Sequence, residues 1–483
     1  MEAEKRAADY SLLSLQVREL LRPAVAVNED TSIQATAAQM TAANSHTALV
    51  VQDNKLAGIV TDQNFRVRVV ASQHDPQDRI TSIMTPQPMT LPPNAPATEA
   101  MLIMAHHNIR HIPIVDPSTQ EILGVVGGTD LLRSHSHNAI YLIGDIYLAK
   151  DVATLTELSL HRPQALVSMV KSLTSYHVSH AISSIGQAIT RRLLQLAEQQ
   201  LGAPPVPYAF LVAGSLARFE QTAYSDQDNG LILSDDYQEA EHGEYFRKLA
   251  DFVCDGLDAC GYEYCKGGIM ASNPQWRQPL SVWRNYFAKW IETPDPQALL
   301  YSTIFFDLRC LYGETTLFED LHTSILRRTQ KSTLFLTHMA ANALNFRPPL
   351  GFFKGFVLEK QANGEKTLDM KKRGVVPVID VARVYTLAAG LPVTNTRERL
   401  QALGQANLLA SDILANVLDA FEFISLTRLR HQARQIAAGQ MANNQVAPDE
   451  LSEFEQRHLK NAFEVAAHFQ DAMAQRYQAN ALR

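Results

Sequence analysis

The sequence has few cysteines, no long hydrophobic run and no secretion signal. Four cysteines in 483 residues cannot form the disulfide framework of a small secreted protein. No apolar run is long enough to span a bilayer, and the first ten residues, MEAEKRAADY, lack the apolar core of a signal peptide. We therefore expect a cytoplasmic protein that has no membrane partner.

Basic residues are also in deficit. The chain has 43 Lys and Arg against 50 Asp and Glu, which gives a formal charge of −7. Proteins that bind nucleic acid phosphates usually have the opposite balance, so we expect no nucleic acid partner. The length is too great for one ordinary core and predicts two to four domains.

The spacing of the cysteines does not indicate a zinc site. Cys254, Cys260 and Cys265 lie close together in the sequence, and Cys310 follows later. No two of them form the CxxC pair that is typical of structural zinc sites. We predict reduced and mostly buried thiols.

Residues 20 to 137 contain an internal repeat. One copy runs from PAVAVNEDTSIQ through HTALVVQDNKLAGIVTD, and the other from IMTPQPMTLPPNAPATEA through IRHIPIVDPSTQEILGVVGGTD. Each copy has an extended entry, an amphipathic helix, two apolar strands and a second helix. This pattern predicts a β-α-β-β-α unit used twice, with each copy packing against the other.

The repeat resembles the cystathionine-β-synthase (CBS) domain pair, a regulatory module that usually binds adenosine nucleotides. In that family a strand-turn of the form G-x-V-T-x-x-D supplies a Thr and an Asp to the ligand. Here the first copy keeps Thr61 but has Asn64 in the Asp position, and the second keeps Asp130 but has Gly127 in the Thr position. The resemblance implies either an adenosine nucleotide held by Thr61 and Asp130, or a dimerisation scaffold with an emptied pocket. It also implies a homodimer.

Two further regions read as mainly helical, and an apolar strand lies between them. Apolar residues recur at three- and four-residue steps between 140 and 200, and again between 331 and 483, where Leu414 to Ile424 and Leu459 to Met473 form stripes. The run YAFLVAGS, which follows GAPPVP, predicts a strand buried on both faces.

The stretch GSLARFEQTAYSDQDNGLIL, residues 214 to 233, carries the strongest chemical signal. Residues two apart in a strand share a face, so Asp226 and Asp228 should project together, with Gln227 turned away. Two parallel carboxylates repel each other unless a cation lies between them, and oxygen ligands favour Mg²⁺ or Mn²⁺. Gly214 allows a close backbone approach, and the Ser215 hydroxyl with backbone N–H groups can hold phosphate oxygens. Arg218 adds a positive charge there or pairs with Glu220.

A third carboxylate is expected on a neighbouring strand. Asp307 lies in the apolar run STIFFDLRCLYG, where a lone buried charge is costly. An ion pair with Arg309 is one explanation, and a metal shared with Asp226 and Asp228 is the other. With the Gly-Ser and DxD elements present, we favour the metal.

The order Gly-Ser, DxD and a later Asp resembles the DNA polymerase β-type nucleotidyltransferase superfamily, in particular its branch with the PII-protein uridylyltransferase. Closer still is a family of bacterial signal-transduction proteins in which a CBS pair precedes such a transferase and a helical C-terminal domain. The segments CKGGIMASNPQW, PPLGFF, LDMKKRG and VIDVARVYTL extend the resemblance over nearly the whole chain. One departure is Leu216 and Ala217, where the family usually has Glu-Gly.

The resemblance implies a multidomain α/β plus all-α protein. The implied parts are an N-terminal tail (1–19), CBS domains (20–78 and 79–137), a helical linker (138–203), a transferase α/β core (204–330) and a C-terminal helical bundle (331–483).

The resemblance also implies a reaction: transfer of a nucleoside monophosphate from an NTP to an acceptor, which we expect to be a PII-like protein. Asp226, Asp228 and Asp307 would be catalytic and would bind Mg²⁺ or Mn²⁺, while Gly214, Ser215, Arg218 and Lys371 would bind phosphate. The alternative is an adenine-nucleotide-sensing CBS protein whose transferase domain is inactive. The Gly pair of KGGIMASN could line the nucleotide-binding cleft that the resemblance implies, or it could form a tight turn.

Overall fold

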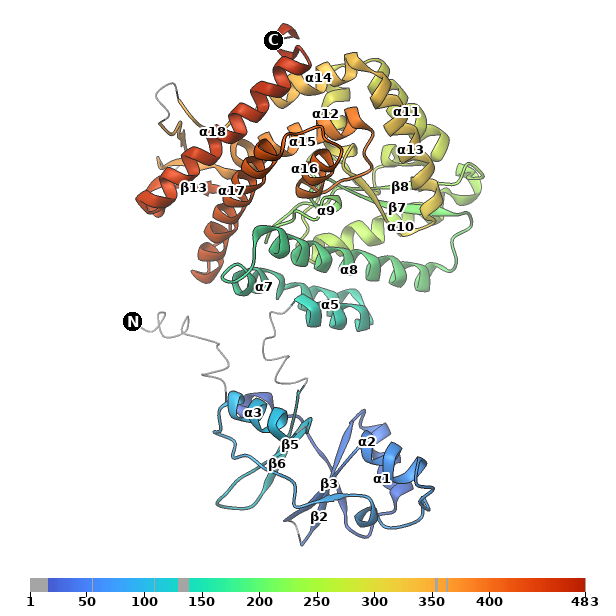
Figure 1. Cartoon of the computed structure of the whole chain (residues 1–483). Helices are drawn as coiled ribbons and strands as arrows, with labels where there is room; N and C mark the ends of the chain where they lie inside the picture. The colour runs from blue at the N-terminus through green and yellow to red at the C-terminus, as the bar shows by residue number, and fades with distance from the viewer. Residues whose placement is uncertain are drawn as a thin grey trace. The chain divides into compact units, whose positions relative to one another are not determined.

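Figure 1 shows the computed structural model of the chain, which describes residues 16–53, 55–107, 109–128, 139–351, 355–361 and 364–482. Two compact units make up the chain, Met1–Ser136 and His137–Arg483. No helix in the described ranges is both long and apolar enough to cross a bilayer.

The first unit contains the predicted repeat. The first copy consists of β1 (Val25–Asn28), α1 (Ile33–Ala42), β2 (Thr47–Gln52), β3 (Lys55–Thr61), α2 (Asp62–Asn64) and η2 (Phe65–Val70). The second copy consists of β4 (Thr85–Pro86), α3 (Ala97–His107), β5 (His111–Val115) and β6 (Ile122–Gly127). The second helix predicted for this copy lies outside the described residues. In both copies the two central strands pair antiparallel, as the repeat predicts.

The two copies exchange their entry segments. Strand β4 of the second copy pairs with β3 of the first, at Ile59 and Thr85. In the other direction, η1 (Val17–Leu20) precedes the first copy, but Val17 is buried in the apolar cluster of the second, and its N–H donates to the carbonyl oxygen of Ala95. Each repeat therefore completes the core of its neighbour.

A four-stranded sheet forms the centre of the second unit. Its order is β10-β7-β8-β9, with β7 (Tyr208–Ala213) antiparallel to both β8 (Asn229–Leu233) and β10 (Leu308–Gly313), and β9 (Arg277–Pro279) parallel to β8. Every residue of β7 is buried, which confirms the prediction for YAFLVA. Phe210 and Val212 face one apolar cluster, while Ala209 and Leu211 face the other.

Helices cover both faces of this sheet (Figure 1). One layer contains α5 (Ala139–Leu148), α6 (Val152–Ser159), α7 (Arg162–Met169), α8 (Ser175–Leu201) and α10 (Glu239–Ala259). The predicted stripe of α8, including Ile182, Ile185 and Ile189, is buried in that layer. The segment expected as a helical linker is helical, but it packs into the core beneath the sheet, which a spacer would not do.

The opposite layer begins with the helices that follow β9. It contains α11 (Leu280–Glu292), α12 (Pro296–Phe305), α13 (Thr315–Lys331), α14 (Thr333–Ala343), α15 (Val376–Ala389) and α16 (Thr396–Gln405), and the short α9 (Gly214–Ala217) follows β7. Asp295 caps α12, because its carboxylate accepts the N–H of Ala298 at 2.7 Å. A cluster of aromatic rings around Trp276 and Trp283 fills this side of the core.

The C-terminal region is mostly helical, as predicted, with α17 (Ser411–Ala437) packed along α18 (Glu453–Arg476). The stripe from Leu459 to Met473 is buried. The pattern did not predict a small sheet there, with order β11-β12-β13: β11 (Glu359–Lys360), β12 (Lys366–Asp369) and β13 (Gln445–Val446). These strands are too short for their alternation to show in the sequence. The remaining short turns of helix are η3 (Ile80–Ser82), η4 (Pro274–Trp276), η5 (Met370–Val375), η6 (Pro448–Glu450) and η7 (Ala479–Leu482).

We expect Gly313→Ala to destabilise the pairing of β10 with β7. Gly313 has φ +89°, and an added Cβ would lie 2.1 Å from the carbonyl oxygen of Tyr208. Gly202, with φ +86° and open space around it, is the matched control for backbone strain alone, which costs about 1–3 kcal/mol. Urea unfolding should show a larger loss for Gly313→Ala than for Gly202→Ala. Equal losses in the free energy of unfolding would show that the strands shift to accommodate the added Cβ, and would contradict this prediction.

Candidate active site

The site is built around the turn that leaves β7. Gly214 has φ +58°, and an added Cβ would lie 3.1 Å from Oδ2 of Asp228. A residue other than glycine would therefore be strained and would crowd the carboxylate. The N–H of Gly214 donates to the carbonyl oxygen of Asp307 at 3.0 Å. Gly214 thus supplies the predicted close approach, but its N–H is already used within the protein and is no phosphate donor.

Asp226 and Asp228 lie together, as their spacing predicts. A carboxylate oxygen of each lies within 4.8 Å of the other and of the Sγ of Cys265. Gln227 between them is buried and turned away, and its amide donates to the carbonyl oxygens of Cys254 and Tyr262. Burial, and then the charge of Asp226, raise the pKa of Asp228 to about 6. Repulsion between the two acids is therefore only partly relieved by the protein.

Basic residues from the C-terminal helices approach this pair. Lys371 lies in η5, where Asp369 accepts its backbone N–H at 3.0 Å. Burial, and then the charge of Arg428, lower the pKa of Lys371, while the charges of Asp226 and Asp228 oppose that shift. Lys371 therefore lies close enough for its charge to act on both carboxylates, although 143 positions separate it from Asp228 in the sequence.

A pocket opens beside the turn. About 880 Å³ of space, part of it open to solvent, is lined by Ser215, Arg218, Lys371 and Arg428 among others. Aromatic side chains from Tyr176, Phe219 and Phe421 also reach this space. The predicted phosphate-binding side chains therefore line one cavity, next to the acidic pair.

Asp307 does not lie where the sequence analysis places it. It precedes β10, its side chain is completely buried, and it does not belong to the group formed by Asp226, Asp228 and Cys265. Its carboxylate is paired with arginines instead, and the predicted role as a third metal ligand is corrected on that ground. The partner is also not Arg309, whose guanidinium lies over the ring of Phe219.

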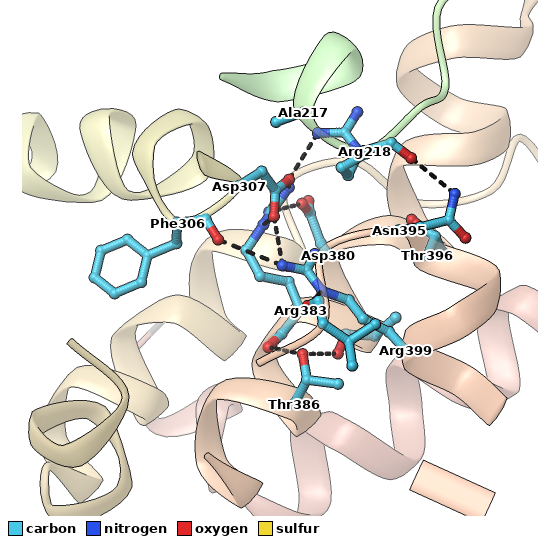
Figure 2. Close-up of polar contacts among 12 residues, drawn as sticks. Ala217, Arg218, Phe306, Asp307, Asp380, Arg383, Thr386, Asn395, Thr396 and Arg399 are labelled. Atoms are coloured by element: carbon cyan, nitrogen blue, oxygen red, sulfur yellow. Dashed lines mark hydrogen bonds and ion pairs between the residues drawn. The ribbon is translucent and has the colours of Figure 1, made fainter. Parts of the chain in front are cut away.

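Three guanidinium groups surround the Asp307 carboxylate (Figure 2). Oδ2 accepts from Arg218 at 2.7 Å and from Arg383 at 2.6 Å, and Oδ1 is paired with Arg399 at 2.7 Å. Burial would raise the pKa of Asp307, but the three positive charges outweigh it and hold that pKa well below its usual range. This leaves the carboxylate ionised and fully engaged.

Two more acids balance the charge of this cluster. Glu220 accepts from Nε of Arg218 at 2.7 Å, and Asp380 accepts from Nη1 of Arg383 at 2.6 Å. Three acids thus face three arginines, which lie directly after α9, in α15 and in α16. Arg218 forms the predicted pair with Glu220, and its side chain also lines the pocket.

The Gly pair of KGGIMASN forms a tight turn. Gly268 has φ +67°, and its carbonyl oxygen accepts from the side chains of Asn273 and Trp276. The segment then runs beside β8, where the Asn229 side chain accepts the N–H of Ala271 at 2.7 Å. Of the two predictions for this segment, the structure supports the turn.

The predicted CBS ligand residues are only partly described. The Thr61 hydroxyl donates to Oδ1 of Asn64 at 2.9 Å, so the Asn in the Asp position closes a local turn with the Thr. Asp130 lies outside the described residues.

Three residues at the site, Arg383, Arg399 and Cys265, were not predicted from the sequence. Arg383, with Asp380 one turn before it, lies within an otherwise apolar helix, and a buried charge at such a place signals a charged partner. Arg399 gave no comparable signal. The prediction of reduced and mostly buried thiols gave Cys265 no role in the site, and its spacing from the other cysteines carries no information about Asp226 and Asp228.

Comparison with known proteins agrees with this division of the chain. The CBS domain model matches residues 17–70 and 80–137. The CBS domain-containing protein YhcV of Bacillus subtilis is 30% identical over 112 residues, which are 23% of this chain and 79% of YhcV. This chain is a CBS domain-containing protein. The predicted CBS pair is confirmed.

Two further family models cover the second unit. Residues 162–297 match "Putative nucleotidyltransferase DUF294", and residues 333–477 match "Putative nucleotidyltransferase substrate binding domain". The first of these matches includes α7 and α8, which agrees with their packing against the sheet.

Other relatives match a fifth to a quarter of the chain. The meiotically up-regulated gene 70 protein of Schizosaccharomyces pombe is 35% identical over 97 residues, 20% of this chain and 13% of that protein. A CBS domain protein from Pyrobaculum aerophilum, solved in complex with AMP, is 25% identical, with a TM-score of 0.23, covering 25% of this chain and 99% of that one. A CBS-domain containing protein from Agrobacterium tumefaciens is also 25% identical, with a TM-score of 0.24 and the same coverage.

We expect Asp307→Asn to destabilise the second unit by about 3–5 kcal/mol, because it leaves buried arginines without their counter-charge. The matched control is Asp320→Asn, since Asp320 forms an exposed pair with Arg284 at 3.7 Å and should contribute less than about 1 kcal/mol. Urea unfolding followed by circular dichroism measures both. A wild-type unfolding curve for Asp307→Asn would contradict the structural role given to this carboxylate.

In buffer free of divalent cations, Asp228→Asn should be more stable than the wild type at pH 8. The folded protein holds the Asp228 proton more tightly than the unfolded chain, because the pKa rises from 3.8 to about 6. The contribution of this proton to the free energy of unfolding is complete below about pH 4 and is lost as the pH rises through 6. The stability difference between variant and wild type should therefore grow over this interval. A difference independent of pH, or the same profile in the exposed control Asp236→Asn, would contradict the shift.

Proposed function

We propose that the second unit transfers a nucleoside monophosphate from an NTP to an acceptor hydroxyl, and that the CBS pair regulates this reaction. The observation that carries the proposal is the convergence of Asp226 and Asp228 beside Gly214, next to a pocket lined by basic side chains. The family descriptions of the matched regions support the same reaction class.

The acidic pair fits a divalent cation. Asp226 and Asp228 would hold it, since their oxygens are the donors that Mg²⁺ and Mn²⁺ prefer and their repulsion is relieved by positive charge. Gly214 leaves open the space in front of Oδ2 of Asp228 that a Cβ would fill. A bound cation would supply charge neutralisation for the triphosphate and would lower the pKa of the acceptor hydroxyl.

The side chains of the protein would contribute by binding and orienting the nucleotide. The hydroxyl of Ser215, the guanidinium of Arg218 and the ammonium of Lys371 line the pocket and would bind phosphate oxygens. Arg218 is held in place by Asp307 and Glu220, so its charge is already oriented before substrate binds. In the transfer, a bond forms between the acceptor oxygen and the α-phosphorus, the bond to pyrophosphate breaks, and the hydroxyl proton leaves.

The finer assignments rest on the resemblance to the PII-uridylyltransferase branch. We propose UTP or ATP as donor, a PII-type protein as acceptor, and an adenosine nucleotide as the ligand of the CBS pair. A bacterial signal-transduction role and a homodimer belong to the same proposal.

One observation favours a second candidate, an adenine-nucleotide-sensing CBS protein with an inactive transferase domain. Asp307 is neutralised by arginines, so two acids rather than three converge at the turn. Under this candidate the protein would bind AMP or ATP without a divalent cation, and that binding would not depend on Asp228.

The transfer reaction can be tested with UTP or ATP labelled at the α-phosphate, Mg²⁺ or Mn²⁺, and a PII-type acceptor. Wild type should label the acceptor and release pyrophosphate, and Asp226→Asn should lower the rate at least about 100-fold. Asp236→Asn, an exposed acid on the turn after β8, should retain wild-type activity. Equal labelling by wild type and Asp226→Asn would refute the mechanism. Cation-independent nucleotide binding without transfer would favour the sensor.

A further inference from the structure

The third donor beside the acidic pair is a thiol. Asp226, Asp228 and Cys265 each offer one ligand atom, and these atoms lie within 4.8 Å of one another. In the described part of the chain, no other group of three His, Cys, Asp or Glu residues comes together in this way. The place that the sequence analysis gave to Asp307 is thus taken by a sulfur atom.

Backbone pairing fixes this sulfur beside the carboxylates. Gln227 and Tyr264 form a parallel bridge, and the N–H of Gln227 donates to the carbonyl oxygen of Glu263 at 3.0 Å. Successive side chains of a strand point to opposite faces, so the residues that follow Gln227 and Tyr264 both point away from the face of that pair. These residues are Asp228 and Cys265, which therefore project together on the side opposite Gln227. The buried amide of Gln227 anchors the bridge from behind. The approach of Cys265 is therefore a built feature of the loop.

We propose that Cys265 is the third protein ligand of the cation bound by Asp226 and Asp228, and that its sulfur shifts the preference of the site from Mg²⁺ towards Mn²⁺, Zn²⁺ and Cd²⁺. This inference rests on the proposed function only in that a divalent cation binds the acidic pair. Magnesium takes oxygen ligands almost exclusively, whereas sulfur favours softer cations. Binding replaces the S–H bond by a sulfur–metal bond and releases one proton to solvent.

The charges near the site agree with a bound cation. Two carboxylates and a thiolate would carry three negative charges, which a divalent ion and the ammonium of Lys371 neutralise. The other cysteines do not compete for this position: Cys254 and Cys260 are buried elsewhere, and Cys310 lies in β10 with its sulfur next to the carbonyl oxygen of Tyr312.

Titration of the full-length protein with Cd²⁺ tests the ligand directly, without any assay of transfer. Wild type should develop the ultraviolet charge-transfer band of a sulfur–cadmium bond. Cys265→Ser should lose the band and bind Cd²⁺ at least about 10-fold more weakly, because losing a metal ligand costs no less than losing the outer-shell partner of one. Cys310→Ser, the matched half-buried thiol, should keep both. Cys265→Asp should lose the band but bind Mg²⁺ more tightly than wild type, because all three donors are then oxygens.

Competition between Mn²⁺ and Mg²⁺, followed by the electron paramagnetic resonance signal of free Mn²⁺, gives the selectivity. The ratio of Mn²⁺ to Mg²⁺ affinity should fall about tenfold in Cys265→Ser. A wild-type protein without the cadmium band, or an unchanged band in Cys265→Ser, would overturn the inference.

The two proposals fail separately. If Mn²⁺ binding requires Asp226 and Asp228 but not Cys265, the thiol is not a ligand and the proposed transferase site remains. If the band requires Cys265, Asp226 and Asp228 but no NTP is ever transferred, the metal site is confirmed and the proposed activity is wrong.

Discussion

The pairing of Asp307 with three arginines is the interaction on which the rest of the second unit depends. A fully buried carboxylate is stable there only because Arg218, Arg383 and Arg399 compensate its loss of hydration. Removing water from six charged groups is costly, and the cost is offset only while the geometry holds all of them in contact. The cluster therefore specifies one arrangement of the elements that carry it.

That arrangement determines the shape of the candidate active site. Asp307 accepts the Gly214 N–H through its backbone and the Arg218 guanidinium through its side chain, so it fixes both ends of the Gly-Ser turn. Asn395 and the N–H of Thr396, at the start of α16, hold the carbonyl oxygen of Arg218 and the carboxylate of Glu220. The C-terminal helices are thereby tied to the turn that borders the acidic pair. Asp307 does not join the acidic pair, yet it orients the residues around that pair.

The sequence was informative where local spacing decides the structure. The apolar run of β7, the shared face of Asp226 and Asp228, and the need for glycine at position 214 all follow from the period of a strand or from one φ angle. The repeated β-α-β-β-α pattern was visible for the same reason.

Contacts between distant segments were not predictable in this way. Arg383 lies 76 positions after Asp307, and Arg218 lies 89 positions before it, so no local pattern connects them. A buried Asp was correctly expected to need compensation, but its spacing could not distinguish a metal from arginines. Cys265 reaches Asp228 through the bridge between Gln227 and Tyr264, which is a long-range contact as well.

The exchange of entry segments in the first unit has a consequence for how such a module can evolve. Because β4 completes the sheet of the preceding copy and Val17 fills the core of the following one, neither copy alone has a closed sheet edge or a covered core. Recombination that moved a single copy would expose apolar surface and unpaired backbone groups. The double repeat is therefore the smallest piece that can be duplicated, inserted or transferred between genes intact.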